Sequence, residues 1–572
     1  MQKSIAAACT AAFLLAGATG AQAHNTGHSK GNTALKAPAK AKDAVGATRI
    51  QLLTVSDWHG QIDPLGTGTT AVGGALALKH HLDKKAAEVP DTLTFMAGDS
   101  VGATPPISSF FADEPAIEVM NRLGVDADAL GNHNFDAGLE RLQRHVDLAE
   151  FPFLSANLPG LDEAVDGVAK RRFFDVRGLR VAVIGITNEE APTLVAPGAF
   201  GPARVVDGVR AADKAARQAR SAGADVVVVL THKGVREIRA DGTPAGELID
   251  FTEAIDEELI DVVVGDHTDF AYTGTHDGVL AVENRSKGAT FSAITLEVDP
   301  RVGVVSKGAE RLVPLVAGST VDADLAAYLN GLRNQLRPIL GTVIGDSTVA
   351  VLRSDSCGRS DGRLCESLVG NVTTDALRST YGTQLAITGS GGLRAALTCP
   401  AAGAGAFCPA SSSTPFPITR GGVLGVLPFG NVSATGALSG AEVKTFLEHG
   451  VSSMPGANGR FAQVSGLCFT YDIAAPVGNR VTSMVLQSAT GSCSTTPLDT
   501  AASYTVSTND FVAAGGDGYP NVLARFTTRN IMDQDLAAYT QAKTTIAPTL
   551  QDRIVCADSN GATTAPNCPA KS

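Results

Sequence analysis

The sequence predicts an α/β fold in the first half of the chain and an α+β fold in the second half. From about residue 48 to 315, β-type apolar runs alternate with helical patterns such as 136–150 and 208–221. This alternation indicates a mostly parallel or mixed sheet that is covered by helices. After about residue 342, helical patterns are mixed with strands and Gly-rich loops. A chain of 572 residues is too long for one hydrophobic core, so we expect two or more domains.

The composition limits the class of protein and the class of partner. Hydrophobic residues make up 44% and charged residues 18% of the chain, as in an ordinary globular protein. The formal net charge of −12 argues against a general binder of nucleic-acid polymers or membrane surfaces, because phosphate groups select basic faces. It does not exclude an anionic substrate, since metal ions and a few arginines can build a local positive site.

Residues 1–23 are predicted to be a secretory signal. Lys3 gives a charged start, residues 11–15 are apolar, and residues 21–23 form a small-x-small cleavage site. The apolar part is too short to span a bilayer, and we expect no membrane span elsewhere. Residues 24–47 are predicted to be a disordered spacer. We therefore expect the mature protein to be secreted or periplasmic.

The cysteines agree with export. Cys9 lies in the predicted signal, and the other eight of the nine cysteines all follow residue 350. These eight are Cys357, Cys365, Cys399, Cys408, Cys468, Cys493, Cys556 and Cys568. They form four close pairs, so bridges between sequence neighbours are the simplest hypothesis among the roughly 105 connectivities that eight cysteines allow. A zinc ribbon is the rival interpretation, and the lack of a Cys-x-x-Cys spacing disfavours it.

A candidate metal site lies where the predicted strands end. Of six apolar runs in the first half, five end in Asp, Asn or His. In open α/β sheets the chemistry gathers beyond the carboxyl ends of the strands, so these five ends predict a convergent metal site. The candidate ligands are Asp57, His59, Asp99, Asn132, His232 and His267. Mixed nitrogen and oxygen ligands suit Zn, Mn, Fe or Co better than Mg or Ca.

Five short blocks contain these residues: 56–60, 98–100, 131–136, 231–232 and 265–269. They resemble the five blocks of the calcineurin-like metallophosphoesterases, and the version here is most similar to the secreted 5′-nucleotidase family. The resemblance covers roughly residues 48 to 550. It implies a metallophosphoesterase β-sandwich flanked by helices, in four αββα layers, and a C-terminal α+β domain of the 5′-nucleotidase type. The expected domains are 48–318 (catalytic), 319–341 (an inter-domain helix), 342–555 (substrate-binding) and 556–572 (a tail).

The resemblance also implies the roles of the ligands. One divalent ion would be held by Asp57, His59 and Asp99. A second would be held by Asp99, which bridges the two ions, together with Asn132, His232 and His267. Asp269 is at the last position of the fifth block and would complete the first ion. Many relatives carry His or another polar residue at this position. The negative charge that Asp269 adds leaves the metal preference of the site open. The expected cofactors are two divalent ions such as Zn, Mn or Co.

His133 is expected to act on the phosphate and not on a metal. In the family this imidazole stabilises charge in the transition state or protonates the leaving oxygen. Asp136, three residues later, can hold the imidazole in one tautomer. The alternative is that Asp136 is only the N-cap of the next helix. The implied mechanism is two-metal hydrolysis, in which an activated water attacks phosphorus.

The second half carries the expected substrate-binding residues. Arg394, at the end of the Gly-rich turn 387–394, and Arg363 resemble the family's phosphate-binding arginines, with Arg359 as a competing candidate. Two further loops, 427–431 and 509–519, resemble the nucleoside-binding loops. The residues expected there are Phe429 and Phe511 as a base clamp, Asp517 on the ribose, and Asn431. Gly389 stands where the family usually has Asn, which suggests altered base selectivity.

The leading hypothesis is a secreted 5′-nucleotidase acting on nucleotides or other small phosphoesters. A phosphodiesterase or pyrophosphatase acting on cyclic nucleotides or nucleotide sugars is the enzymatic rival. A non-catalytic nucleotide-binding protein is disfavoured, because the ligands, His133 and Asp136 are intact. With metals on one domain and the base clamp on the other, closure would assemble the site, and the helical pattern at 321–340 is a candidate hinge. The sequence does not determine the oligomeric state.

Overall fold

The computed structural model describes residues 46–66, 68–400, 407–409, 414–488, 491–559 and 568–570. The predicted signal at 1–23 and all but the last two residues of the predicted spacer therefore lie outside the described residues. No described helix combines the length and the apolar character needed to cross a membrane.

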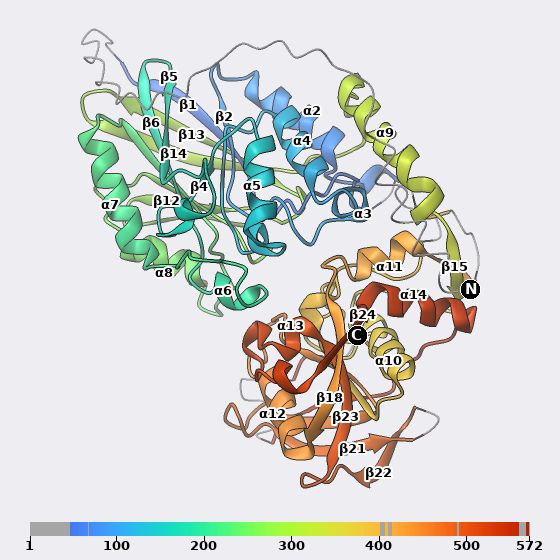
Figure 1. The fold of residues 1–572 in the computed structure, drawn as a ribbon. Helices are drawn as coiled ribbons and strands as arrows, with labels where there is room; N and C mark the ends of the chain where they lie inside the picture. The colour runs from blue at the N-terminus through green and yellow to red at the C-terminus, as the bar shows by residue number, and fades with distance from the viewer. Residues whose placement is uncertain are drawn as a thin grey trace. The chain divides into compact units, whose positions relative to one another are not determined.

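The first half of the chain contains two six-stranded sheets (Figure 1). In the first sheet the strand order is β14-β13-β1-β2-β3-β4. Its strands are β1 (Thr48–Val55), β2 (Leu93–Met96), β3 (Ala127–Ala129), β4 (Phe153–Leu154), β13 (Phe291–Asp299) and β14 (Gly303–Leu312). Strands β1 to β4 pair in parallel, whereas β13 runs antiparallel to β1 and β14. The predicted mixed sheet is confirmed here.

In the second sheet the order is β11-β12-β10-β7-β6-β5. Its strands are β5 (Arg171–Val176), β6 (Leu179–Ile186), β7 (Val226–Thr231), β10 (Val262–Gly265), β11 (Tyr272–His276) and β12 (Val279–Glu283). The central strands β6, β7, β10 and β12 are parallel, and they are almost wholly apolar because both of their faces are buried. The alternation of apolar runs and helical patterns predicted one sheet, whereas the strand pairing shows two.

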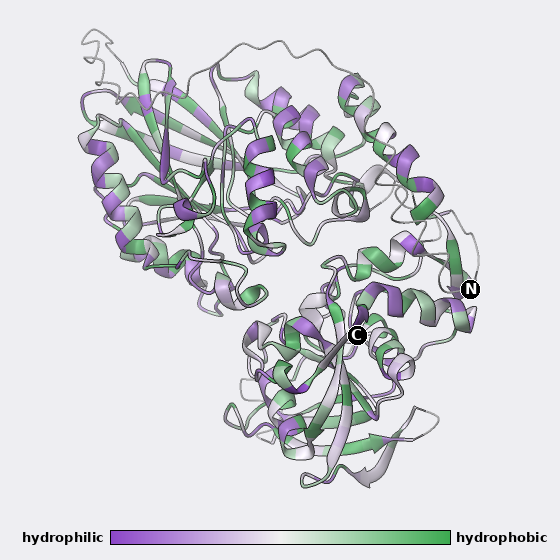
Figure 2. Cartoon of the chain, in the orientation of Figure 1, coloured by the Kyte–Doolittle hydropathy of each residue, from purple (hydrophilic) through white to green (hydrophobic). Residues whose placement is uncertain are grey.

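The two sheets pack face to face, and helices cover their outer faces. Alternate residues of each strand point to opposite sides. Leu52 therefore packs in the core between the sheets, while Leu53 packs in the core beneath helices α2 (Ala75–Ala86), α4 (Glu114–Leu123) and α5 (Gly138–Leu148). The second sheet is covered by α7 (Gly208–Ser221) and α8 (Glu247–Ala254). Helices α5 and α7 carry many hydrophilic residues (Figure 2). These layers confirm the αββα fold class.

A helix also occupies the region that was predicted to join the domains. Helix α9 (Ala323–Leu340) begins after Asp322, whose carboxylate accepts a hydrogen bond from the Leu325 N–H over 2.8 Å. Its buried face consists of Leu325, Leu329, Leu332, Leu336 and Leu340. These leucines follow helical spacing, which explains why the sequence predicted a helix here. The domain boundaries and the hinge role of this helix stay predictions.

The second half of the chain has an α+β arrangement. Its central sheet has the order β19-β16-β23-β18-β24. These strands are β16 (Leu385–Gly389), β18 (Val432–Ser439), β19 (Ala462–Ser465), β23 (Ser503–Asn509) and β24 (Thr527–Ile531). The longer helices are α10 (Leu368–Tyr381), α12 (Gly440–Gly450) and α14 (Met532–Lys543). Helix α12 begins with a capping box between Ser439 and Glu442, a start signal that can be recognised in the sequence.

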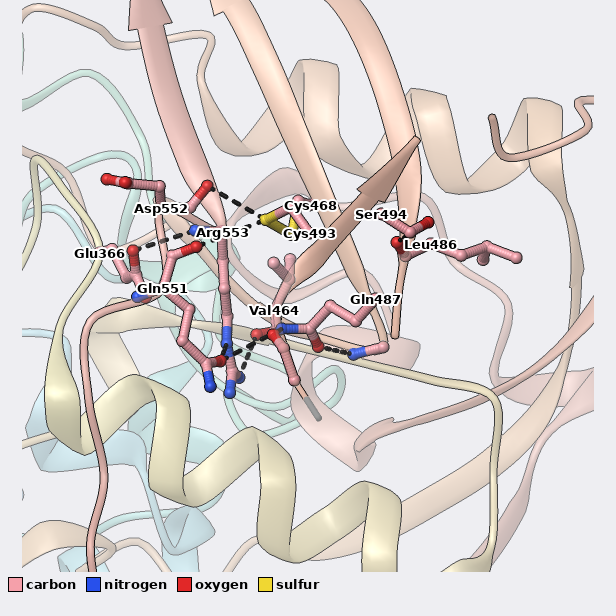
Figure 3. The surroundings of a disulfide bond; sticks show 12 residues. Glu366, Val464, Cys468, Leu486, Gln487, Cys493, Ser494, Gln551, Asp552 and Arg553 are labelled. Carbon is pink, nitrogen blue, oxygen red and sulfur yellow. Dashed lines mark hydrogen bonds between the residues drawn. A yellow bond between two sulfur atoms is a disulfide. The ribbon is translucent and has the colours of Figure 1, made fainter. Parts of the chain in front are cut away.

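Four disulfides stabilise this half, and each joins a cysteine to its neighbour in sequence, as the simplest hypothesis predicted. The bridges are Cys357–Cys365, Cys399–Cys408, Cys468–Cys493 and Cys556–Cys568. The bridge Cys468–Cys493 connects β20 (Leu467–Asp472) to β22 (Cys493–Pro497), beside the segment that carries Gln551 and Arg553 (Figure 3). Because all eight sulfurs are in disulfides, none of these cysteines is available for a zinc ribbon.

Candidate active site

The predicted ligands lie at the carboxyl ends of neighbouring strands. Asp57, Asp99 and Asn132 follow the parallel neighbours β1, β2 and β3. His232 and His267 follow the parallel neighbours β7 and β10 of the other sheet. Carboxyl ends of parallel neighbours meet at one edge of their sheet, so the topology gathers each of these two sets. The packing of one sheet on the other then brings Asp99 to His232 and His267.

Three groups of side chains place their ligand atoms within 4.8 Å of one another. The groups are His59, Asp99 and His133; Asp99, His232 and His267; and Asp57, His232 and Asp266. Two residues, Asp99 and His232, each belong to two groups. Five of the seven predicted metal ligands are thereby brought together: Asp57, His59, Asp99, His232 and His267.

The backbone at this edge adopts conformations that L-residues rarely take. Positive φ angles occur at Asp57 (42°), His59 (49°), Asp99 (44°), His267 (88°) and Asp269 (53°). Each such residue costs roughly 1–3 kcal/mol, and strain of this kind clusters at functional sites. Hydrogen bonds between backbones hold the loops in place: the His59 N–H donates to the Asp99 carbonyl over 2.9 Å. The fold therefore sets the directions of these side chains.

Buried oxygens at the site lack partners. Asn132 Oδ1 and Asp57 Oδ1 are buried and accept no hydrogen bond within the part of the chain that the structure describes. Burial and the neighbouring Asp266 carboxylate raise the pKa of Asp57 well above its ordinary value. Unpaired buried oxygens and crowded carboxylates are costly without a positive charge. A divalent cation would satisfy both, so the donor set fits the expected metals.

The histidines are oriented toward these groups. His232 Nε2 lies 2.9 Å from Asp99 Oδ2 and 3.0 Å from His267 Nδ1. His59 Nδ1 lies 2.9 Å from the Gly102 carbonyl, which leaves Nε2 to bind a metal. Two imidazole nitrogens and a carboxylate oxygen at such separations are compatible with ligands of one ion.

Asp269 does not join them. Its side chain is 59% exposed, and its Oδ1 accepts a hydrogen bond from the Ser286 N–H over 2.9 Å. The Arg285 guanidinium donates to the Asp269 carbonyl. The structure therefore keeps this carboxylate outside the three groups, and its role as a ligand stays a prediction.

Two acidic residues that the sequence analysis did not assign do reach the site. Asp266 is completely buried and belongs to the third group. Glu190 Oε1 lies 3.1 Å from His267 Nε2. Asp266 could have been found, because it directly precedes His267 at the end of an apolar run. Glu190 also follows an apolar run, β6, but lies four residues beyond its last residue, so the run-end pattern did not single it out.

His133 and Asp136 form a close pair beside the metal groups. His133 Nδ1 is 2.6 Å from Asp136 Oδ2, and His133 Nε2 is 4.0 Å from Asp99 Oδ2. Burial lowers the pKa of His133, but the Asp136 and Asp99 carboxylates outweigh it, so the pKa is raised. The N-cap of α5 is Ala137, without a side-chain bond. Asp136 therefore contacts the imidazole and does not cap the helix.

A glycine makes room for this pair. Gly102 has a φ of 75°, and a Cβ there would lie 2.6 Å from His133 Cβ and 2.9 Å from Asp136 Oδ2. Any side chain at this position would displace one of the two residues. The same glycine positions His59 through its carbonyl, so a single turn supports both the candidate metal ligand and the candidate catalytic histidine.

The arginines of the second half differ in their freedom to bind a phosphate. Arg359 donates two hydrogen bonds of 3.0 Å to the Asp361 carboxylate. Arg363 Nε is buried without a partner within the described residues. Burial and the neighbouring Arg363 lower the pKa of Arg394 to about 10. Of the two competing candidates, Arg363 is the one with a buried donor that lacks a partner among the described residues.

The aromatic residues lie as follows. The Phe429 ring stacks on the His133 ring with centroids 5.7 Å apart and planes 9° from parallel. The Arg394 guanidinium lies 5.7 Å from the Phe429 ring centroid. The Phe511 ring packs over Gly516, where a Cβ would lie 2.5 Å from the ring atom Cδ2. Phe429 is thus placed near the candidate catalytic histidine, and the base clamp with Phe511 stays a prediction.

Asp517 and Asn431 belong to the two loops that were predicted to bind a nucleoside. Asp517 has a φ of 56°, and burial raises its pKa, against the lowering effect of Arg363 and Arg460. The Asn431 carbonyl accepts a hydrogen bond from the Met532 N–H over 2.8 Å. An acceptor at Asp517 near two guanidinium groups fits a polar ligand.

Comparisons with known proteins agree with this arrangement. A family model described as "5′-nucleotidase, C-terminal domain" matches residues 343–525. The crystal structure of a 5′-nucleotidase precursor from Thermus thermophilus is 26% identical, with a TM-score of 0.74, over 89% of this chain and 99% of that one. Snake venom 5′-nucleotidase from Gloydius brevicauda is 27% identical over 83% of each protein.

Endonuclease YhcR from Bacillus subtilis is also 27% identical, over 81% of this chain. The chain spans only 37% of the length of that relative.

Two facing sheets with acidic, amide and imidazole groups at their strand ends are the arrangement expected of a metallophosphoesterase, which is a class of hydrolase. Within that class, the chain is similar to 5′-nucleotidases in both sequence and fold. The three candidate metal groups of the structure offer His and Asp atoms that could hold divalent ions.

Proposed function

We propose that the protein removes the 5′-phosphate from nucleotides, with water as the second substrate and a nucleoside and phosphate as the products. The observation that carries this proposal is the position of His133. Its Nδ1 is bound to Asp136 at 2.6 Å, and its Nε2 faces Asp99, which belongs to two of the candidate metal groups. An imidazole in that place is suited to a phosphoryl group held by metals.

Two divalent ions would be held by the predicted ligands: Asp57, His59 and Asp99 for one, and Asp99, Asn132, His232 and His267 for the other. Bound there, the ions would supply Lewis acidity and lower the pKa of water toward neutrality. The unpartnered Oδ1 atoms of Asn132 and Asp57 support this assignment. The buried Asp99 carboxylate is kept ionised, because His232 and His133 outweigh the effect of burial and lower its pKa.

His133 would then act on the leaving group. Asp136 accepts a hydrogen bond from the Nδ1–H, so that Nε2 is the nitrogen presented to substrate. Because the pKa of His133 is raised, a protonated imidazole is favoured, and it can stabilise charge on a phosphoryl oxygen or protonate the departing ribose oxygen. This step needs no covalent intermediate with the protein.

Arg363 and Arg394 would bind the phosphate, and Phe429, Phe511, Asp517 and Asn431 the nucleoside. Charge-assisted hydrogen bonds from guanidinium groups suit phosphate oxygens. Stacking on an aromatic ring stabilises a base by about 1–3 kcal/mol and tolerates different bases. The division into a catalytic domain and a substrate domain joined by α9 remains part of this proposal.

A phosphodiesterase or pyrophosphatase activity is the second candidate. One relative, 27% identical over most of this chain, is named an endonuclease, and that name denotes cleavage of diesters. The same ligands would serve either reaction. Gly389 offers no side-chain amide to a base, which is compatible with relaxed base selectivity. A Cβ added at Gly389 would lie 3.1 Å from the Gly459 carbonyl oxygen, so a larger residue would need a small shift of that backbone.

We also propose that the protein works outside the cytoplasm. Four disulfides in the described residues suit an oxidising compartment, and one relative is a venom enzyme by name. The predicted signal at 1–23 agrees with this location. Mass spectrometry of the N-terminus of protein recovered from outside the cell would test it, with cleavage after residue 23 as the expected result.

The proposed activity is tested by phosphate release from AMP, ATP, UDP-glucose and 2′,3′-cyclic AMP after metals are stripped and added back. We expect AMP to be hydrolysed only after a divalent ion is restored. Faster turnover of UDP-glucose or of the cyclic nucleotide would favour the second candidate. Full activity in excess chelator would refute the metal-dependent reaction.

A further inference from the structure

Two carboxylates lie behind the imidazoles that face the second metal position. The Nε2 of His232 points toward Asp99 and His267, so its other nitrogen, Nδ1, points away from them. In the same way, the Nδ1 of His267 points toward His232, and its Nε2 points away. A histidine that binds a metal through one nitrogen carries its proton on the other, and that buried N–H needs an acceptor.

Asp266 is the acceptor that faces His232. Asp266 Oδ2 lies 3.7 Å from His232 Nδ1, and both atoms are buried without a hydrogen-bond partner among the described residues. Closing this gap by roughly 0.7 Å would give an ordinary N–H···O distance of about 3.0 Å. Two facing groups, one donor and one acceptor, are each left unsatisfied unless they pair.

The backbone around Asp266 holds it in this place. Its Oδ1 accepts a hydrogen bond from the His267 N–H over 2.9 Å, and its own N–H donates to the Lys233 carbonyl over 2.9 Å. Asp266 is therefore hydrogen-bonded both to the segment that carries His232 and to the segment that carries His267. Its carboxylate also belongs to the group that contains Asp57.

Glu190 is the acceptor that faces the second nitrogen of His267. Its Oε1 lies 3.1 Å from His267 Nε2, which is within hydrogen-bond distance. The hydrogen bond to His267, more than the opposing effect of burial, lowers the pKa of Glu190. Glu190 precedes the short helix α6 (Ala191–Leu194) after β6, so it reaches the site from a third strand end.

We propose that Asp266 and Glu190 are positioning residues, which orient the imidazoles of His232 and His267 toward one divalent ion. Carboxylates that accept the second N–H of a metal-bound histidine set its tautomer and raise its basicity, and their loss typically costs 10–100-fold in metal affinity. This inference rests on the proposed function, because it assumes that His232 and His267 bind metal.

The test measures metal binding and not turnover. Metal-free full-length protein is titrated with Co²⁺, and visible absorption follows each equivalent. Wild type is expected to take up two equivalents. In Asp266→Asn, one amide cannot accept from both the His267 backbone and His232, so we expect one Co²⁺ to bind 10–100-fold more weakly. The other Co²⁺ is expected to keep its affinity.

Glu190 provides a rescue experiment. Glu190→Ala is expected to weaken the same Co²⁺ by at least tenfold. Glu190→Gln keeps an oxygen that can accept from His267 Nε2, so its affinity should return to within about threefold of wild type. The matched controls are Glu257→Ala, an exposed glutamate, and Asp126→Asn, whose carboxylate accepts a hydrogen bond from the Thr94 N–H. Neither control should change Co²⁺ binding.

The outcomes separate the inference from the function on which it rests. Wild-type protein that binds no Co²⁺ would refute both. Wild-type protein that binds two equivalents, together with unchanged affinities in Asp266→Asn and Glu190→Ala, would overturn the inference alone. Thermal unfolding of the metal-free variants checks their folding. If Asp266→Asn fails to fold, the Co²⁺ affinities of Glu190→Ala and Glu190→Gln test the proposal instead. An equal loss of Co²⁺ affinity in these two variants would overturn it.

Discussion

His133 Nδ1 and Asp136 Oδ2 are 2.6 Å apart, and the two residues are separated by a single short turn, η3 (His133–Phe135). The turn brings the carboxylate back beneath the ring, and Gly102 leaves space for both side chains. The ring is also stacked against Phe429. Its orientation is therefore fixed from two sides, as expected for a group that must present one nitrogen to a substrate.

Replacing His133 should slow turnover with little effect on nucleotide binding. A general acid or charge stabiliser contributes typically 10²–10⁴-fold, so we expect kcat for AMP in His133→Ala to fall by that factor. In Asp136→Asn the kcat for AMP should fall by less, because the amide oxygen can still accept a hydrogen bond from His133 Nδ1. Steady-state kinetics would separate kcat from KM. Equal losses in kcat and in AMP affinity would contradict the assigned role.

The two candidate arginines should respond differently to truncation. Arg363 has a buried Nε without a partner among the described residues, whereas Arg359 is paired with Asp361. A hydrogen bond to a charged group is worth about 1.5–3 kcal/mol, so Arg363→Ala should raise KM for AMP by roughly 10–150-fold. Arg359→Ala should change it by less than about threefold. A larger effect at Arg359 would reverse this assignment.

The sequence predicts most of the metal ligands because strand ends are local features. An apolar run that stops at Asp, Asn or His can be recognised without knowledge of the fold, and parallel pairing then gathers the ends. The disulfides were predictable for a similar reason, since each bridge closes a short loop, such as that between Cys357 and Cys365, which are eight positions apart.

What sequence patterns did not predict depends on tertiary structure. Nothing local shows that β7 and β1 belong to different sheets, because both are apolar runs that end in polar residues. Asp269 lies outside the three candidate groups, with its side chain 59% exposed, and no local pattern distinguishes it from His267 two residues earlier. Glu190 meets His267 only because two strand ends converge.

The disulfide Cys468–Cys493 should stabilise the protein more than Cys357–Cys365. Loop-closure entropy grows with the number of residues enclosed, and the separations are 25 and 8 residues. The chain-entropy relation gives about 3.5 kcal/mol for the longer loop and about 2.5 kcal/mol for the shorter. Denaturant unfolding of the two double Cys→Ser variants would measure the difference. An equal or reversed order would show that native-state contacts outweigh loop entropy.

Stability should also depend on pH through Asp128. This residue is completely buried, and its Oδ1 accepts a hydrogen bond from the Gly98 N–H over 3.0 Å. Burial raises the pKa of Asp128 to about 8, although the hydrogen bonds from Ser100 and Gly98 lower it. In the unfolded chain the same group has a pKa near its ordinary value of about 3.9. Between these two values the folded state holds a proton that the unfolded state has released.

The sign of the effect follows from this difference in bound protons. Because the unfolded state binds fewer protons at this group, the contribution of Asp128 to the free energy of unfolding falls as the pH rises from about 4 toward about 8. Asp128→Asn removes the titration and keeps an acceptor for Gly98, so its free energy of unfolding should fall less between pH 5 and pH 8. Urea unfolding in chelator at both pH values would measure this, with the exposed Asp162→Asn as the control. The same pH dependence in Asp128→Asn and in wild type would show that Asp128 is ionised in the folded protein, and that the buried oxygen is compensated by a group other than a proton.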